Sequence, residues 1–151
     1  MAHRARAARP ARRRGGFFCD ALNQQQIAVA ADRLGYDGVG FNEHHTSPYG
    51  LMNSPNLLAA AAAQRTKNIK LLIYANLLPL HHPLRLAEEL AMLDCMSHGR
   101  IISGFARGIP REYQVHNIPL SESRERFEEA YEIVTKAWSQ DVFSFEGKFN
   151  S

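Results

Sequence analysis

The sequence predicts an α/β fold in which parallel strands alternate with helices. Segments with apolar residues at helical spacing alternate along the chain with short apolar runs of strand length. Because helices of this length must cross over between neighbouring strands, the strands are expected to be parallel, with right-handed connections. A doubly wound sheet and a (β/α)8 barrel both fit this order. No GxGxxG or Walker loop follows any strand, which weakens the interpretation as a nucleotide-binding doubly wound sheet.

Four helices are predicted from the spacing of apolar residues. Gly35 suits the end of the first helix, and Ser54 and Pro55 suit the N-cap and the first position of the second. The third ends near Gly99, and the fourth is the most clearly amphipathic segment of the chain. The predicted ranges are 22–35, 54–66, 83–99 and 121–138.

Three strands are predicted between these helices, over residues 36–42, 69–80 and 100–108. The run over 69–80 is almost continuously apolar, which is typical of a parallel strand covered on both faces. Residues 141–150 alternate in polarity and predict an exposed hairpin outside the main sheet. Both candidate architectures collect functional groups at the carboxyl ends of their strands, so the polar stretches that follow the three strands are the candidate site.

Charge is distributed unevenly along the chain. The formal net charge is +3, but the first 19 residues hold six arginines and no acid, and removing those six charges leaves −3 for the remainder. Residues 1–16 are expected to form a disordered Arg-rich tail, and residues 17–151 to form the domain. The tail is either a nucleic-acid or targeting arm or simply an unstructured terminus.

The composition of the domain excludes several classes of function. No basic face for nucleic acid is evident in it, and no apolar run reaches the roughly 18 residues of a membrane span. Cys19 and Cys95 lack the spacing of a zinc site, so reduced thiols in a cytoplasmic protein are expected.

The first strand ends in an acid and two adjacent histidines, Glu43, His44 and His45. Side chains alternate across a strand, so Glu43 and His45 are expected on one side and His44 on the other. Histidines on opposite sides make a poor bidentate metal site and no third ligand has suitable spacing, so no metal site is predicted. Glu43 could orient a histidine by hydrogen bonding, and a histidine at this edge can exchange protons near neutral pH. His81 and His82 are interpreted as loop and cap residues.

Two arginines suit the binding of a phosphate group. Arg107 ends the third strand and is followed by Gly108, and the planar guanidinium can bind phosphate there with two hydrogen bonds. Arg124 lies near the start of a helix, where the helix dipole favours anions. Alternatively, Arg124 pairs with Glu128 one turn later and Arg107 is an ordinary rim residue.

Taken together, these segments resemble the bacterial luciferase-like family of flavin-dependent monooxygenases. The resemblance runs from about Leu22 to the C-terminus and rests on the combination of EHH, LPLHHPLRLAEE, LDCMSHGR and a strand that ends in ARG. It implies a (β/α)8 barrel, often dimeric, that uses reduced flavin mononucleotide (FMN) and O2, although some relatives use coenzyme F420 for hydride transfer. A full barrel needs about 250 residues, so the chain is expected to form the N-terminal half of a TIM barrel. Compared with the family, its first strand, at GGFFCD, is expected to be damaged or replaced.

The resemblance also implies roles for individual residues. His44 would assist the oxygen reactions of the reduced flavin, with His45 as a supporting group. A cis peptide is implied at residues 74–75, with Ala75 as a flat floor for the isoalloxazine ring, and Ala106 lies where some relatives carry a cysteine. The predicted cofactor-binding residues are Glu43, Tyr74, Ala75, Asn76, Arg107, Gly108 and Arg124; Asn76 would bond the ring edge and the arginines the phosphate.

The resemblance predicts a flavin-dependent monooxygenase that acts on a small organic substrate with O2, with a flavin reductase supplying reduced FMN. A homo-oligomer is expected, with neither a nucleic-acid nor a membrane partner. Two other functions stay open: a catalytically silent, truncated flavin-binding or dimerisation module, and an F420-dependent oxidoreductase. Because the first strand is doubtful and later strands are missing, the sheet is expected to keep open edges and exposed apolar surface.

Overall fold

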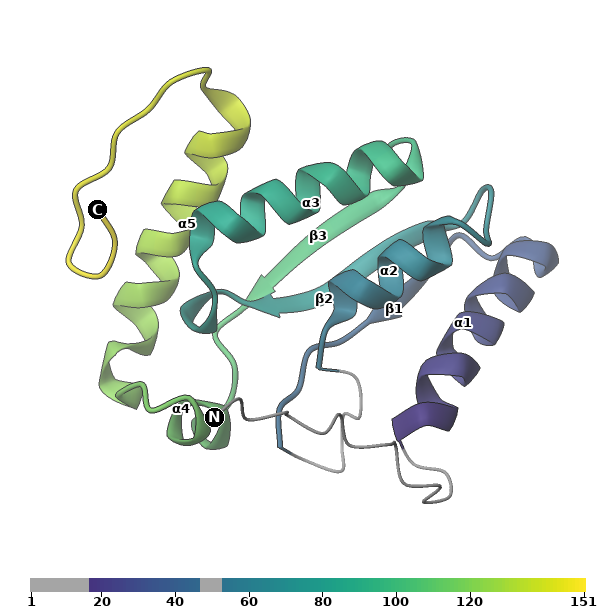
Figure 1. The fold of residues 1–151 in the computed structure, drawn as a ribbon, viewed down its shortest axis with the longest axis horizontal. Helices are drawn as coiled ribbons and strands as arrows, with labels where there is room; N and C mark the ends of the chain where they lie inside the picture. Colours follow the sequence, from purple (N-terminus) through teal and green to yellow (C-terminus); the bar gives the residue numbers. More distant parts are fainter. Residues whose placement is uncertain (1–16, 47–52) are drawn as a thin grey trace, which may run out of the picture.

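The structure is a computed structural model that describes residues 17–46 and 53–151, with side chains from residue 23 onward (Figure 1). The predicted Arg-rich tail, residues 1–16, lies outside the described residues. None of the described helices is both long enough and apolar enough to cross a bilayer.

The strands form one parallel sheet in the order β1-β2-β3. β1 pairs with the first half of β2, with Phe41 opposite Ile73, and β2 pairs with β3 with a register shift between Ile73 and Asn76. All three strands therefore end at the same edge of the sheet, as the sequence predicts. Their bounds are β1 (Gly38–Phe41), β2 (Lys70–Leu77) and β3 (Ile101–Ala106).

All four predicted long helices are present, although α1 begins five residues before its predicted start at residue 22. Pro55 takes the first position of α2, although the side chain of Ser54 makes no cap hydrogen bond. Gly35 follows α1 with a φ of +79°, a left-handed conformation that glycine adopts without strain. α1 begins at Phe17, so the segment predicted to hold a damaged first strand is helical from that residue onward. The long helices are α1 (Phe17–Leu34), α2 (Pro55–Ala63), α3 (Pro83–Ser97) and α5 (Ser123–Ser139).

Three short elements were absent from the sequence prediction. The 3-10 turn η1 (Leu78–Leu80) takes up the end of the run that was predicted to be one long strand. The helix α4 (Pro110–Val115) and the turn η2 (Leu120–Glu122) connect β3 to α5. These elements matter because they fold back over the carboxyl edge of the sheet.

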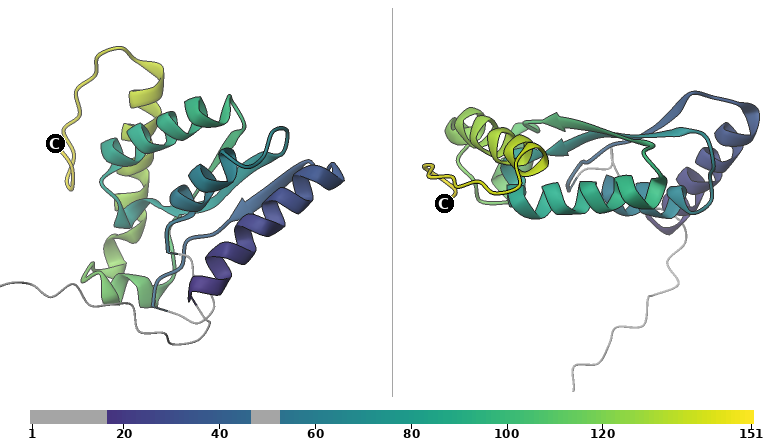
Figure 2. Two further views of the ribbon diagram at one scale, coloured as in Figure 1. Left: turned by 45° about the vertical axis from the view of Figure 1, so that its right-hand side comes forward. Right: turned by 90° about the horizontal axis from the view of Figure 1, so that it is seen from above.

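Helices α1, α2 and α3 lie on one face of the sheet, and the described helices leave the other face open (Figure 2). Along β2, Leu71 and Ile73 are fully buried in the helix-covered core, whereas Tyr74 is 71% exposed. Ile102 of β3 is 48% exposed on the open side. The expectation that strand 69–80 is covered on both faces is therefore wrong for the described residues. A doubly wound sheet has helices on both faces, so the one-sided cover favours the wall of a barrel, whose helices all lie outside.

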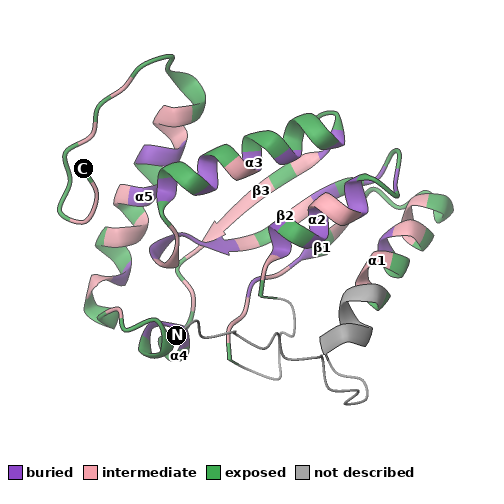
Figure 3. Ribbon diagram, in the orientation of Figure 1, coloured by how far each residue is buried: buried purple, intermediate pink, exposed green. Residues whose placement is uncertain are grey.

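The core lies between the sheet and the first three helices, and small residues let these helices pack closely (Figure 3). Ala28 of α1 and Ala59 and Ala62 of α2 are fully buried at this contact. From α3, Leu86 and Leu90 lie one turn apart and are also buried. The alanine run predicted to favour close packing has that role in the structure.

Two charged side chains fix the loops at the amino edge of the sheet. Arg100 is only 7% exposed, and its guanidinium donates to the carbonyl oxygens of Ala63 at 2.9 Å and Ser97 at 2.7 Å. Asp32 of α1 accepts the backbone N–H groups of residues 67–69 at 2.8–2.9 Å, and these bonds lower its pKa. Arg100 thus pairs carbonyl groups at the C-terminal ends of α2 and α3, and Asp32 pairs N–H groups of the loop between α2 and β2.

Residues 140–151 contain no strand, so the predicted hairpin at 141–150 is wrong. The segment instead returns along α5 (Figure 1) and is held by the carboxylate of Glu129, which accepts the backbone N–H groups of residues 148–150 at 2.6–3.3 Å. Partial burial raises the pKa of Glu129, but the bonds from Asn150 and its neighbours outweigh this and lower it. Val142 is 88% exposed, so the alternation in this segment does not reflect a buried face.

Candidate active site

Three polar segments meet at the carboxyl edge of the sheet, because parallel strands bring their carboxyl ends together. The first follows β1, the second spans the end of β2 and the turn η1, and the third runs from β3 into α4. They contribute Glu43, His44 and His45; Asn76 and His81; and Arg107, Gly108 and Glu112.

A buried carboxylate, Glu43, joins the first two segments. It is 2% exposed, and it contacts Nε2 of His45 at 2.8 Å and Nε2 of His81 at 2.8 and 2.9 Å. It also accepts the side-chain amide of Asn76 at 3.2 Å and the backbone N–H of Leu77 at 3.1 Å. We refer to Glu43, His45, Asn76 and His81 as the Glu43 cluster. The prediction that Glu43 and His45 share one side of the chain is confirmed.

The environment of Glu43 favours its ionised form. Burial acts to raise its pKa, but hydrogen bonds from His81 and His45, the charge of His81 and the N–H of Leu77 outweigh burial. Together they lower the pKa of Glu43 to about 2. The carboxylate is therefore an acceptor that holds two histidines in place over a wide range of pH.

His44 points away from this cluster to a second buried carboxylate, that of Glu112 in α4. The Nδ1 atom of His44 lies 3.0 Å from Oε1 of Glu112, whose side chain is fully buried, whereas the His44 side chain is 23% exposed. The same oxygen accepts the backbone N–H of His45 at 3.3 Å. The two adjacent histidines thus bind different carboxylates, as their expected opposite orientation requires.

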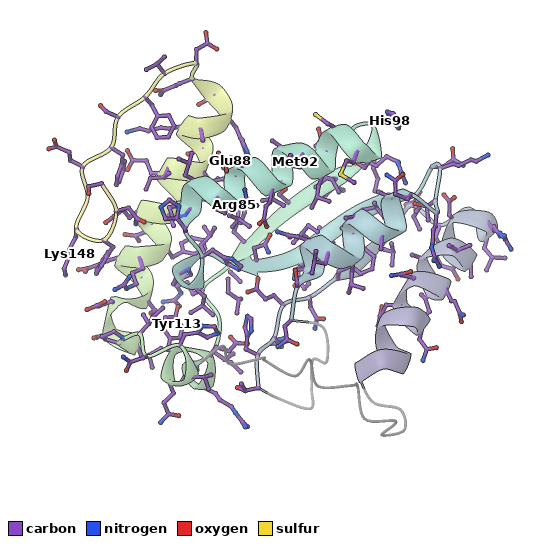
Figure 4. The ribbon with its side chains drawn as sticks, in the orientation of Figure 1. Arg85, Glu88, Met92, His98, Tyr113 and Lys148 are labelled. Carbon is purple, nitrogen blue, oxygen red and sulfur yellow. The ribbon has the colours of Figure 1, made fainter. Side chains whose placement is uncertain are left out.

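Glu112 and its neighbour Tyr113 also shape the turn after β3. The Oε2 atom of Glu112 accepts the backbone N–H of Ile109 at 2.8 Å, just before α4 begins. The hydroxyl of Tyr113, a buried residue of α4 (Figure 4), donates to the carbonyl oxygen of Arg107. Gly108 has a φ of +88°, and a Cβ atom there would lie 2.8 Å from Oε2 of Glu112. Glycine is therefore required for the turn to close over the buried carboxylate.

Arg107 and Arg124 line the same cavity, although they are 17 residues apart in the sequence. The cavity has a volume of about 460 Å3 and is also lined by Phe105, Ala106, Phe127 and Glu128. Arg124 donates from Nε to Oε1 of Glu128 at 2.8 Å, and this bond raises the pKa of Arg124. The predicted helical ion pair of Arg124 with Glu128 is present, whereas phosphate binding by Arg124 stays a prediction, although the residue lines the cavity. The cavity opens beside the N-terminus of α5, where backbone N–H groups favour an anion.

Small residues lie on the open face of the sheet where β2 meets β3. The peptide bond between Tyr74 and Ala75 is cis, which confirms this part of the prediction. A Cβ atom on Gly104 of β3 would lie 2.7 Å from the carbonyl oxygen of Ile73 and 3.7 Å from the Cβ atom of Ala75. Only glycine lets the two strands approach this closely, and the result is a patch of small residues around Ala75.

Asn76 has a structural partner that the sequence did not predict. It is 1% exposed, and its amide nitrogen donates to Glu43, while its buried Oδ1 atom has no partner among the described residues. Its bond to the edge of a flavin ring therefore stays a prediction.

Sequence reasoning missed Glu112 and assigned His81 to a loop. The EHH stretch identified the strand end, but the contact between His44 and Glu112 joins residues 68 positions apart through a helix of six residues. The available signal was weak: Glu112 is the third residue of a helix that starts at Pro110, and an acidic residue at that position often accepts the N–H group of the residue before the helix. Among the residues that the structure describes, no group of three or more His, Cys, Asp or Glu side chains is arranged to hold a metal ion.

The chain is similar to known monooxygenases. It matches the family model of luciferase-like monooxygenases over residues 6–151. Limonene 1,2-monooxygenase of Rhodococcus erythropolis is 38% identical over 116 residues, which cover 76% of this chain and 30% of the relative. The chain spans 30% to 36% of the length of the curated relatives that it matches.

Two solved structures share the fold. Monooxygenase RslO1 of Streptomyces bottropensis has a TM-score of 0.86 and 37% identity, covering 89% of this chain and 42% of its own. The oxygenating constituent of 3,6-diketocamphane monooxygenase of Pseudomonas putida, a type II Baeyer-Villiger monooxygenase in complex with FMN, has a TM-score of 0.82 and 32% identity. It covers 95% of this chain and 39% of its own. From its sequence over almost its whole length and from its fold, the chain belongs to the luciferase-like monooxygenase family.

Proposed function

We propose that the chain forms the flavin-phosphate and proton-transfer part of a monooxygenase site that uses reduced FMN and O2 to oxygenate a small organic substrate. The observation that carries this proposal is the convergence of Arg107 and Arg124 on one cavity at the edge of the sheet where His44 lies. The relative from Pseudomonas putida that was solved with FMN supports the choice of cofactor. In this proposal the chain supplies part of the wall of a (β/α)8 barrel.

The cavity fits the phosphate group of FMN. Arg107 offers a planar guanidinium, and its carbonyl is held by Tyr113, which fixes the backbone of the turn. Arg124 and the N-terminus of the 17-residue helix α5 add positive potential on the other side of the cavity. Glu128 also lines the cavity, so a phosphate group would compete with this carboxylate for Arg124.

The open face of the sheet fits the flat flavin ring. Ala75 and Gly104 leave it without large side chains where β2 and β3 meet, and the exposed ring of Tyr74 lies beside this patch. Reduced FMN, when bound, supplies the two electrons with which one atom of O2 enters the substrate and the other leaves as water.

His44 is the proposed proton-transfer residue. Its imidazole lies at the edge of the sheet, partly exposed, and can hold or deliver a proton at Nε2 while Nδ1 is bound to Glu112. Glu43 is proposed to act indirectly, because its oxygens already accept four protein donors. It holds the ends of β1 and β2 at the spacing that the site requires.

A separate flavin reductase is proposed to supply reduced FMN, and a homo-oligomer is proposed as the functional state. The oligomer is supported by an apolar groove between α2 and α3, with a volume of about 360 Å3. Its side chains Leu57, Met92 and Met96 are 72%, 60% and 42% exposed. Exposed apolar surface of this kind marks association sites more often than free surface.

Turnover in 18O2 tests this function. The chain would be mixed with FMN, NADH and a flavin reductase, and with limonene or an alkanal as test substrate, and products would be analysed by mass spectrometry. We expect 18O-labelled product that accounts for less than about half of the O2 consumed, with H2O2 as the remainder, because the open face admits water to the flavin. Labelled product no higher than in a protein-free control would contradict the proposal.

The same face of the sheet favours one alternative, a flavin-binding module that is catalytically silent by itself. Tyr74 and Ile102 are exposed there, so the described residues provide only one wall of a ring-binding pocket. FMN bound through Arg107 without labelled product would identify this alternative. The two outcomes therefore separate binding from catalysis.

A further inference from the structure

Glu112 lies between the histidine proposed to transfer protons and the turn that carries Arg107. We propose that Glu112 is a positioning residue, which holds His44 in the tautomer that carries its proton on Nδ1 and joins it to the phosphate-binding turn. This inference rests on the proposed function for its role in catalysis, but the geometry on which it depends is independent of flavin. No feature of the EHH stretch itself points to Glu112.

The contacts of Glu112 indicate that it acts as a hydrogen-bond acceptor toward His44. Its side chain is fully buried, and each oxygen already accepts a backbone N–H, Oε2 from Ile109 at 2.8 Å and Oε1 from His45 at 3.3 Å. Because Glu112 already acts as an acceptor at both oxygens, we assign the 3.0 Å contact as donation from Nδ1–H of His44. A neutral imidazole with its proton on Nδ1 keeps a lone pair on Nε2, which is the form that a proton acceptor needs.

The same carboxylate is built into the turn after β3. A Cβ atom on Gly108 would lie 2.8 Å from Oε2, so the turn closes directly over Glu112. Arg107 precedes this glycine, and its carbonyl is held by Tyr113, the residue after Glu112. The orientation of His44 and the conformation of the turn that presents Arg107 therefore depend on one rigid segment at the start of α4.

The Glu43 cluster offers a matched control. Glu43 is also a buried carboxylate of this edge, and its bonds to histidines go to His45 and His81. A change in His44 caused by a general loosening of the edge would follow removal of either carboxylate. A change caused by the loss of its own partner would follow only removal of Glu112.

The tautomer of His44 can be read directly from the 15N chemical shifts of its ring nitrogens in the full chain, by long-range 1H–15N correlation at a pH where the ring is neutral. The signals are assigned with His44→Gln, and no flavin is added, so the result is independent of whether FMN binds. We expect His44 in the unmodified chain to be mostly the Nδ1–H form. In Glu112→Ala it should lose its preference for the Nδ1–H form, because the acceptor at Nδ1 is gone, and in Glu43→Ala it should keep the Nδ1–H form.

Three results would overturn the proposal: a predominant Nε2–H form in the unmodified chain, retention of the Nδ1–H form in Glu112→Ala, or an equal change in Glu43→Ala. If circular dichroism shows that Glu112→Ala is unfolded, Glu112→Asp takes its place, because its shorter side chain keeps the charge but cannot span Ile109 and His44 together. The same criterion then applies, and the measurement on the unmodified chain decides by itself in either case.

Discussion

Replacing Glu43 with glutamine should destabilise the fold most at neutral pH and progressively less in acid. The carboxylate accepts from the ring nitrogens of His45 and His81, from the amide of Asn76 and from the backbone of Leu77. Glutamine has one acceptor oxygen in place of two, so buried donors are left unpaired. The change keeps the size of the side chain, so it isolates the charge from the packing.

The magnitude follows from the pKa of Glu43, which is about 2 in the folded state against 4.5 for the ordinary group. The folded state therefore binds fewer protons, and the stabilisation is present above pH 4.5 and is lost as the pH falls toward 2. A difference of this size corresponds to about 3 kcal/mol of unfolding free energy at pH 7 and to about 1.4 kcal/mol at pH 3.

Urea unfolding of the chain and of Glu43→Gln at pH 7, 5, 4 and 3 measures this difference. Glu88→Gln is the control: Glu88 lies on the outer side of α3 (Figure 4), 3.5 Å from Arg85, and should change stability by less than about 0.5 kcal/mol at every pH. A loss in Glu43→Gln that is the same at pH 7 and pH 3, or no larger than that of Glu88→Gln, would refute the reasoning.

Three further outcomes are expected. Arg100→Met should lower the free energy of unfolding, measured in urea, by about 3 kcal/mol, because the carbonyls of Ala63 and Ser97 lose a buried charged donor. A loss below about 1 kcal/mol would be inconsistent with this role of Arg100. Glu128→Gln should strengthen inorganic phosphate binding about two- to fivefold in calorimetry, since Arg124 loses its competitor; unchanged or weaker binding would argue against the shared cavity. The unmodified chain should sediment as an oligomer, and Met92→Lys should shift it toward monomer, because Met92 is exposed in the apolar groove between α2 and α3; a compact monomer without the substitution would contradict this.

The fold was predictable where periodicity is strong. Apolar spacing located the four long helices and three strands, and Gly35 and Pro55 fixed two of the helix ends. The pattern failed over 141–150, where alternation predicted a hairpin. There Glu129, on another element, binds three successive backbone N–H groups and holds the segment without any partner strand.

The sequence predicted which strand ends carry the site residues, but it did not predict the hydrogen-bond partners of those residues. In an extended chain, successive side chains point to opposite sides. This local rule correctly placed Glu43 and His45 on one side of the chain and His44 on the other. The acceptor for His44 comes from Glu112 on a six-residue helix, too short to leave a periodic signal. The 3-10 turn η1 brings His81 to Glu43. Because the residues of this turn are apolar, the sequence pattern predicted that the strand continues through them. Contacts between distant segments of this kind are set by tertiary packing rather than by local sequence.

Binding of FMN by the unmodified chain and by Arg107→Ala tests the central claim most directly. Calorimetry or quenching of flavin fluorescence gives both dissociation constants, and Arg85→Ala is the matched control, since Arg85 is an exposed arginine on α3 that does not line the Arg107 cavity. We predict that Arg107→Ala weakens FMN binding by about 1.5–3 kcal/mol, or roughly 10- to 150-fold. Inorganic phosphate should compete with FMN for the unmodified chain, and Arg85→Ala should not change the affinity for FMN. Equal FMN affinity in Arg107→Ala and the unmodified chain would contradict a flavin-phosphate site at this cavity.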